Sequence, residues 1–227
     1  DLLTMVKTKV VFDHHRQSSE TIQGAVLSYC EPYASSASEL IAEMMQYIRE
    51  GIKAKPIEAD CMYGGIVIDT REFTNQTGVR TFEAAAYLRR CGADIIRIRK
   101  TFREDFIDYQ AKADTISKAD IYREYYAIST LERAGTESPT VLCAKAANEL
   151  LNIRGIKASI VLTKVEDTVF LSARSIDELN VQVLMEKLGG GGHRTVAGAQ
   201  MKGFTVEECI DKVRAAIDEM IEEGEVE

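Results

Sequence analysis

Three short motifs contain all three histidines of the chain, together with acidic residues that could act beside them. The first is Asp13-His14-His15, which follows an apolar run, and the last is His193, which follows four glycines. Between them lies Asp69, at the end of another apolar segment. Imidazole nitrogen is a common ligand of Mn, Fe, Co and Zn, and a neighbouring carboxylate can bind the same ion or orient the ring. The pattern therefore predicts metal chemistry.

The two adjacent histidines are expected to have different tasks. Neighbouring side chains of a strand point to opposite faces, so both cannot face one ion unless the strand has ended. We expect one of them to bind the metal and the other to reach an oxygen of the substrate. Asp13 would accept the second N–H of the ligand imidazole and fix its tautomer. The alternative is a hydrogen-bonded cluster at the surface.

Asp69 stands where a buried element reaches the surface. Carboxylates in such places often bridge metal ions, because their two oxygens can serve two cations. The alternative for Asp69 is a helix cap or a turn cap.

The glycine run before His193 predicts a phosphate or nucleotide site. Four ordered glycines are entropically costly, so they indicate a sharp turn or a close approach of the backbone to a ligand. Exposed backbone N–H groups of such a run bind anions, and His193 and Arg194 add donors. Upstream, Arg174 lies at the end of a predicted strand that also contains Ser172, and its guanidinium could bind a phosphate in a bidentate manner. The alternatives are a flexible linker for the glycines and an ordinary surface charge for Arg174.

Composition limits the class of protein. The chain has 227 residues, of which 45% are hydrophobic and 28% charged, as expected for one large or two small globular domains. The formal net charge of -8 argues against binding of long nucleic acid. Five scattered cysteines without a Cys-x-x-Cys pair indicate free thiols and a cytoplasmic setting. The sequence shows neither a signal peptide nor an apolar run of membrane-spanning length.

Hydrophobic periodicity predicts α/β units in both halves. In the first half we expect a strand ending at Asp13 and a helix that begins at a Ser36/Glu39 capping box and stops at Gly51. Two further helices are expected, one opening at Pro56 and ending near Asp69, the other closed by Gly92. In the second half the expected elements are a charged connecting helix over 101–118, a strand over 121–130, a helix over 138–153, a hairpin over 157–175, a short helix over 181–190 and a closing helix over 206–223.

The order and spacing of these motifs resemble the DHH phosphoesterase superfamily with its DHH-associated domain. The resemblance rests on the segments VVFDHH, GIVIDT and GGGGH, with Asp69 standing 55 positions after His14. The flanking sequences EPYASSASELIAEMMQY, IDTREFTNQTGVRTFEAAAYLRRCGAD and NVQVLMEKLGGGGHRTVAGAQM are similar to the GdpP (YybT) type, the cyclic di-AMP phosphodiesterases of Gram-positive bacteria. The resemblance covers nearly the whole chain.

This resemblance implies a fold and a reaction. The fold would be the C-terminal part of a DHH domain with a parallel-sheet core (1–100), a connecting helix (101–118) and a smaller α/β DHH-associated domain (119–227). Two divalent metal ions, usually Mn²⁺, would activate a hydroxide that opens cyclic di-AMP to linear pApA. The substrate would lie in a cleft between the two domains.

The resemblance also assigns roles to individual residues. His14 would bind one metal, Asp69 would bind or bridge both, Asp13 would lie behind the ligands, and His15 would lie near the scissile phosphate. Substrate would be bound by a second group of residues in the other domain, namely Gly190, Gly191, Gly192, His193, Arg174 and Ser172.

One departure from the family is expected to matter. Its first motif, His-x-x-x-Asp-x-Asp, and the aspartate of its second motif come before the Asp-His-His motif, and twelve residues precede Asp13 here. We therefore expect a C-terminal portion of a longer enzyme, incomplete as a metal centre, whose parent is anchored to a membrane through upstream regions. Two alternatives stay open: a DHH enzyme acting on short oligoribonucleotides or 3′-phosphoadenosine phosphate, and a nucleotide-sensing domain. Homodimerisation is also left open.

Overall fold

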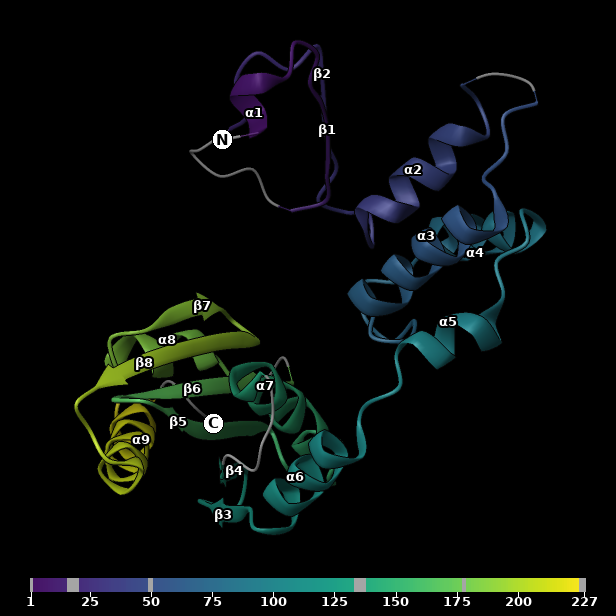
Figure 1. Cartoon of the computed structure of the whole chain (residues 1–227). Coiled ribbons are helices and arrows are strands. Elements are labelled where there is room, and N and C mark those ends of the chain that lie inside the picture. The colour runs from purple at the N-terminus through teal and green to yellow at the C-terminus, as the bar shows by residue number, and fades with distance from the viewer. Residues whose placement is uncertain (1, 16–20, 49–50, 133–137, 177–178, 225–227) are drawn as a thin grey trace. The chain divides into compact units, whose positions relative to one another are not determined.

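The computed structural model describes residues 2–15, 21–48, 51–132, 138–176 and 179–224 of the chain (Figure 1). These residues form two compact units that divide between Arg103 and Glu104. Each unit has its own buried core, so each is described by itself. The domain bounds at 100 and 119 stay a prediction.

The first unit is a small parallel sheet followed by helices (Figure 1). Its two strands pair in parallel, so that Asp13 lies opposite Cys30 at the carboxyl end of both. In chain order its elements are α1 (Leu2–Met5), β1 (Val10–Asp13), β2 (Leu27–Cys30), α2 (Ala37–Met45), α3 (Pro56–Asp69), α4 (Val79–Arg90) and α5 (Ile95–Thr101).

Local sequence signals explain where these helices begin. The Ser36 hydroxyl accepts a hydrogen bond from the Glu39 N–H at 3.0 Å and caps α2. The Glu39 carboxylate does not complete the expected capping box, because it accepts a 2.5 Å hydrogen bond from Ser35. Pro56 is the first residue of α3, as predicted. Side chains of α2, α3, α4 and α5 then form the core of this unit, including Ile66 and Leu88, which are fully buried.

The second unit is a sheet with helices on both faces. Its described residues form a six-stranded sheet with the order β3-β4-β5-β6-β8-β7, in which β4 and β5 are parallel and the other neighbours antiparallel. Its elements are α6 (Phe106–Ser117), β3 (Asp120–Tyr122), β4 (Tyr126–Leu131), α7 (Pro139–Leu150), β5 (Ala158–Val165), β6 (Thr168–Ser175), α8 (Val181–Lys187), β7 (Gly191–His193), β8 (Val196–Lys202) and α9 (Val206–Glu222).

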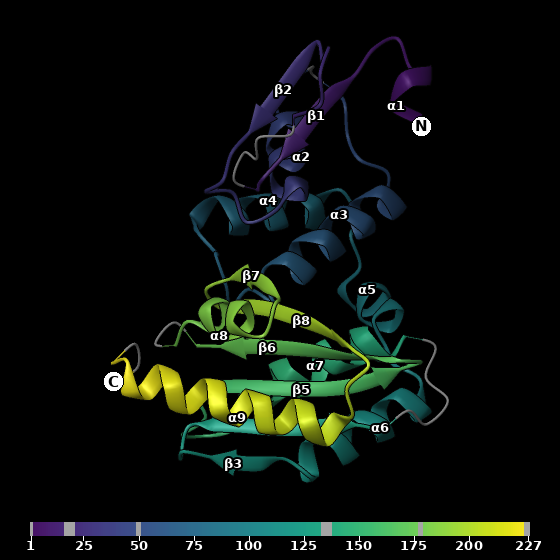
Figure 2. The same cartoon turned by 90° about the vertical axis from the view of Figure 1, so that its left-hand side faces the viewer.

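The two faces of this sheet have separate cores. Residues of α8 and α9 pack with Ile160 and Ala173 on one face, whereas residues of α6 and α7 pack with Val161 on the other. Figure 2 shows α9 lying along one face, with α7 behind the sheet. This mixed α/β arrangement confirms the predicted fold class.

Several predicted elements differ in extent. Helix α2 ends at Met45, before Gly51. The connecting helix is observed as α6, packed on α7 through Ala111, and the separate α5 precedes it. The single strand predicted over 121–130 is wrong, because Arg123 and Glu124 adopt left-handed backbone and reverse the chain between β3 and β4. Glycine and proline are the residues that most often mark a turn in a sequence, and this turn contains neither, so the sequence did not reveal it.

The other predicted helices and the hairpin across Glu166 are confirmed. All five cysteines are free, as their spacing predicted. Among the described residues, we find no helix with the length and apolar character that crossing a lipid bilayer requires.

Candidate functional site

The first unit brings His14 and Asp69 together although they lie 55 positions apart in sequence. The His14 Nε2 and Asp69 Oδ2 atoms lie 3.6 Å apart, and the two side chains are 15% and 38% exposed. His14 follows the last residue of β1, and Asp69 is the last residue of α3. The end of a strand and the end of a helix therefore place a nitrogen and an oxygen donor next to each other, near the surface of this unit.

Asp13 contacts His15, which differs from the expectation that it orients the metal ligand. The Asp13 Oδ1 atom lies 2.8 Å from His15 Nδ1 and accepts a 2.9 Å hydrogen bond from the His15 backbone N–H. These bonds, the backbone one foremost, lower the pKa of the Asp13 carboxyl below its ordinary value. The carboxylate therefore stays charged and fixes the His15 ring. The rings of His14 and His15 remain close, with centroids 4.3 Å apart.

Thr70 has a structural task that the sequence did not reveal. This fully buried residue donates from its hydroxyl to the Ile66 carbonyl at 2.7 Å, and the same oxygen accepts from the Phe73 N–H at 3.0 Å. Its carbonyl accepts from the N–H groups of Thr74 and Asn75. Thr70 thus fixes the loop that follows α3 directly after Asp69.

The second unit aligns four of the six predicted substrate-binding residues, namely Ser172, Arg174, Gly191 and His193, on one face of its sheet. Ser172 of β6 lies opposite Gly198 of β8, which in turn lies opposite Gly191 of β7. The next row contains Arg174, Val196 and His193 in the same strand order. Directly opposite residues share a face of a sheet, so Ser172, Arg174, Gly191 and His193 point to the side that α7 partly covers.

The glycine run is an edge strand rather than an open nest. The N–H groups of Gly189 and Gly190 donate to the carbonyls of Glu186 and Met185 and end α8. A Cβ on Gly190 would lie 2.1 Å from the Gly198 oxygen, and one on Gly192 would lie 2.5 Å from the Val196 oxygen, whereas one on Gly191 would meet nothing within 4 Å. The fold therefore requires the glycines at 190 and 192. The flexible-linker alternative is wrong.

The remaining predicted residues of this unit lie in different surroundings. His193 is exposed and Arg174 half-buried, with its Nη1 donating to the Ala173 carbonyl at 2.8 Å. Ser172 lies against Cys143 of α7. Burial raises the pKa of the Cys143 thiol to about 12, despite an opposing hydrogen bond from Ser172. Cys143 is therefore a core thiol and no nucleophile at neutral pH.

His14 and Asp69 fit part of a metal centre. With metal–ligand bonds of about 2.1 Å, two donor atoms 3.6 Å apart can contact the same ion. Imidazole nitrogen and carboxylate oxygen also suit Mn²⁺ and related ions. Within the described residues, no group of three or more His, Cys, Asp or Glu side chains lies close enough to hold an ion. Among the described residues, His14 and Asp69 would thus supply two donors to an ion, and a full coordination sphere would need others.

Two protein-family models match this chain, one within each unit. The model of the DHH family, N-terminal domain, matches residues 2–66, and the model of the DHHA1 domain matches residues 124–223. The chain contains DHH and DHHA1 domains. The DHH match includes His14 and ends just before Asp69, and the DHHA1 match includes the aligned rows of β6, β8 and β7.

Several curated relatives of these DHH and DHHA1 domains are named cyclic-di-AMP phosphodiesterases. The chain is 44% identical over 216 residues to the cyclic-di-AMP phosphodiesterase GdpP of Geobacillus thermodenitrificans, covering 95% of the chain and 33% of the relative. It is 42% identical over 219 residues to the cyclic-di-AMP phosphodiesterase PdeA of Listeria monocytogenes, covering 96% and 33%. The chain thus spans about a third of the length of these relatives.

A solved structure confirms the fold of the DHH and DHHA1 domains. An exopolyphosphatase-related protein from Bacteroides fragilis superposes with a TM-score of 0.80 at 22% identity, covering 94% of this chain and 64% of that one. At this identity the likeness concerns the fold.

Proposed function

We propose that this chain is part of a metal-dependent phosphodiesterase that hydrolyses cyclic di-AMP to linear pApA. The observation that carries the proposal is the approach of His14 Nε2 to Asp69 Oδ2 within 3.6 Å. It occurs in a chain 41–44% identical, over 95–98% of its length, to proteins named cyclic-di-AMP phosphodiesterases.

The proposed metal ligands are His14 and Asp69, and the proposed ions are two divalent cations, Mn²⁺ in the first instance. When bound, such ions lower the pKa of a coordinated water and stabilise negative charge on a phosphate. Both donors lie near the surface of the DHH unit, where a substrate phosphate can reach them.

His15 is proposed to contact the scissile phosphate. Its Nδ1 faces the Asp13 carboxylate at 2.8 Å, which leaves Nε2 as the ring nitrogen that can hydrogen-bond to a phosphate oxygen. The side chain of His15 is 76% exposed, so substrate can reach it. Asp13 is then a positioning residue for His15.

The DHHA1 unit is proposed to bind the substrate through the face carrying Gly191, His193, Ser172 and Arg174. Gly190 and Gly192 contribute indirectly, because their lack of a side chain lets β7 approach β8. His193 and Arg174 lie in one cross-strand row, so they could contact the same anionic group.

A segment exchange tests the proposal. The matching segment of the Listeria relative is replaced by this chain, and hydrolysis of cyclic di-AMP is measured with Mn²⁺. We expect activity, and we expect His14→Ala and Asp69→Ala each to reduce kcat by orders of magnitude, because the metals supply both nucleophile and charge stabilisation. Asp211→Ala, which removes an exposed carboxylate of α9, serves as the control.

Three other outcomes would point elsewhere. Full activity of either ligand variant would contradict the metal assignment. Preferred cleavage of short oligoribonucleotides or 3′-phosphoadenosine phosphate would favour another DHH enzyme. Tight calorimetric binding of cyclic di-AMP in EDTA, without turnover in Mn²⁺, would favour a sensor.

A further inference from the structure

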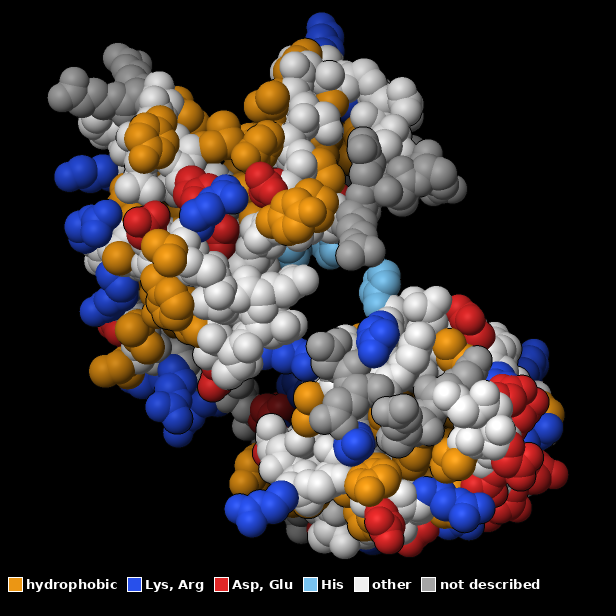
Figure 3. Space-filling model, turned by 180° about the vertical axis from the view of Figure 1, so that it is seen from behind, with side chains coloured by type: hydrophobic (Ala, Val, Ile, Leu, Met, Phe, Trp, Pro, Cys, Tyr) orange, Lys and Arg blue, Asp and Glu red, His pale blue; other side chains and the backbone are white. Residues whose placement is uncertain are grey.

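The DHH unit contains an aromatic pocket that none of the roles above uses. It has a volume of about 620 Å³, within the range of small-ligand sites. Tyr33 and Phe82 line it and are 91% and 57% exposed, which is unusual for aromatic side chains. Figure 3 shows hydrophobic side chains of this unit close to its histidine side chains.

Aromatic rings continue from the core of the unit to this pocket. The ring of Phe82 is stacked on that of Phe73, with centroids 5.6 Å apart and planes 15° from parallel. Phe73 in turn packs edge-on against the buried Tyr63 at 6.0 Å. The exposed ring of Phe82 is therefore held in a fixed orientation.

The loop that supplies Phe73 is held in an unfavourable conformation. Arg71, Glu72, Phe73 and Gln76 all have positive φ, although none is glycine. Such residues persist only where the surroundings over-determine them, and they cluster at ligand sites. Here the hydrogen bonds of Thr70 fix the loop.

The pocket uses residues from two segments near the metal-ligand motifs, one after β2, which pairs with the strand ending at Asp13, and the other directly after Asp69. The Glu31 N–H donates to the Asp13 carbonyl at 2.9 Å, and Tyr33 lies only two residues beyond, within about 7 Å along the backbone. Phe73 and Gln76 follow Asp69 in the loop after α3. A nucleotide whose phosphate lies at His14 and Asp69 would thus have its base on the side of this pocket.

We propose that the Tyr33–Phe73–Phe82 pocket stacks one purine base of the substrate and that Gln76 selects adenine. This inference rests on the proposed function. Every base has a π-face that an exposed aromatic ring can stack on. Gln76 lines the same pocket, and in the described structure its side-chain amide makes no hydrogen bond. A primary amide pairs in a bidentate manner with N6 and N7 of adenine, whereas guanine presents two acceptors there and suits arginine.

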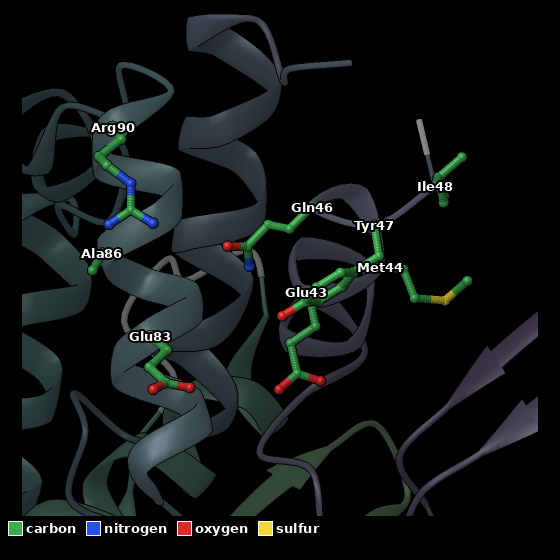
Figure 4. Close-up of a pocket in the computed structure, with 8 residues that line it drawn as sticks. All are labelled: Glu43, Met44, Gln46, Tyr47, Ile48, Glu83, Ala86 and Arg90. Carbon is green, nitrogen blue, oxygen red and sulfur yellow. The ribbon is translucent and has the colours of Figure 1, made fainter. Parts of the chain in front are cut away.

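A second hollow of the same unit provides matched controls. It lies between α2 and α4 with a volume of about 770 Å³, and Figure 4 shows Tyr47 and Gln46 among its lining residues. Tyr47 is 86% exposed, comparable to Tyr33. Glu43 of this hollow forms a 2.7 Å ion pair with Arg80, so its surroundings are charged rather than aromatic.

The experiment measures binding to the Listeria relative that carries this chain as its matching segment, with Mn²⁺ present, and this protein is the wild type for the variants below. The probes are hydrolysis-resistant phosphorothioate analogues of cyclic di-AMP and cyclic di-GMP, titrated by calorimetry. We expect Tyr33→Ala and Phe82→Ala each to weaken binding of the adenine analogue about tenfold, because each removes a ring on which the base would stack. Tyr33→Phe should bind like the wild type, as should Tyr47→Ala.

A second set of variants tests the selection of adenine. Gln76→Arg should lower the ratio of adenine to guanine affinity by about tenfold, while Gln46→Arg should leave it unchanged. An unchanged ratio in Gln76→Arg would overturn the selection of adenine by this residue.

The outcomes separate this inference from the proposed function. If the wild type binds the adenine analogue and both Tyr33→Ala and Phe82→Ala bind it equally well, the base pocket is refuted while the phosphodiesterase proposal stands. If the wild type binds neither analogue, both proposals are overturned. Because Tyr33 is almost fully exposed, its substitution tests the pocket even if Phe82→Ala disturbs folding.

Discussion

Asp69 and Thr70 are neighbours in sequence with opposite surroundings. The Asp69 side chain reaches the surface beside His14, whereas Thr70 is fully buried and bonds to both the last turn of α3 and the loop that follows. A buried donor or acceptor left without a partner costs more than an exposed one. The threonine therefore contributes to stability, and through the loop it fixes the end of α3 where Asp69 lies.

Thr70→Val should destabilise the chain by about 1–2 kcal/mol, because the isosteric side chain leaves the Phe73 N–H and the Ile66 carbonyl without this partner. Thr101→Val is the matched control, since the Thr101 hydroxyl bonds only to the carbonyl four residues earlier, in an exposed turn. Urea denaturation measures both. Equal free energies of unfolding for the two variants would contradict the role of Thr70.

Strand β7 can pair with β8 because glycines stand at 190, just before the strand, and at 192, within it. The alternation of crowded and open positions along 190–192 follows from the pleat, in which successive residues point to opposite faces. The same alternation leaves the open side of Gly191 on the face proposed to bind substrate.

Gly190→Ala should lower the free energy of unfolding by about 3 kcal/mol or separate β7 from β8, because its Cβ would overlap backbone atoms that cannot move independently. Gly191→Ala should change the free energy of unfolding by less than about 1 kcal/mol. Thermal denaturation and hydrogen exchange of the β8 amides measure the effects of the two variants. If Gly191→Ala is stable yet binds the substrate analogue less tightly, the backbone of β7 contacts substrate.

Helix α6 is held to α7 by a carboxylate shared between two lysines. Glu104 accepts hydrogen bonds from Lys112 at 2.6 Å and Lys145 at 2.9 Å, and its side chain is 18% exposed. Burial raises the pKa of the Glu104 carboxyl, but the two lysines outweigh this effect and lower it below its ordinary value.

Glu104→Gln should therefore lower the stability of the second unit by about 1 kcal/mol at pH 7. Because the folded pKa is depressed, the stabilisation is full above the ordinary value of 4.5 and is lost as the pH falls through the folded pKa. The difference between wild type and variant should stay constant from about pH 6 to 8 and shrink below about pH 4. Glu132→Gln, which breaks an exposed pair with Lys118, should show no such trend in urea denaturation.

At the scale of the whole molecule, the chain has two units with separate hydrophobic cores. The core of the first unit consists of residues from α2 to α5, whereas the sheet of the second unit has a core on each face. A cavity in one core should therefore destabilise its own unit first.

Leu88→Ala removes a fully buried side chain of the first core and should cost that unit about 2–5 kcal/mol. Ile160→Ala makes the equivalent change in the second unit. Hydrogen exchange read by mass spectrometry should show faster exchange in α3 and α4 for the first variant, with β5 and β6 unaffected, and the reverse for the second. Equal acceleration in both units would show that they unfold as one.

The sequence by itself determined the features that depend on neighbouring residues. Pro56 and the Ser36 cap mark helix starts, and the hairpin across Glu166 follows from alternating strands and a short turn. These signals are local, so hydrogen bonds and side-chain periodicity over a few residues suffice to read them. The same applies to the three motifs, whose residue types indicate metal and phosphate chemistry wherever the chain places them.

Only the tertiary structure decided which residues meet. It placed His14 beside Asp69, joined Asp13 to His15 rather than to His14, and paired the glycine run with β8 as an edge strand. These contacts depend on the register of strands and the packing of helices far apart in sequence, which no local preference specifies. For the same reason the aromatic pocket was invisible in the sequence, where its exposed rings look like ordinary core residues.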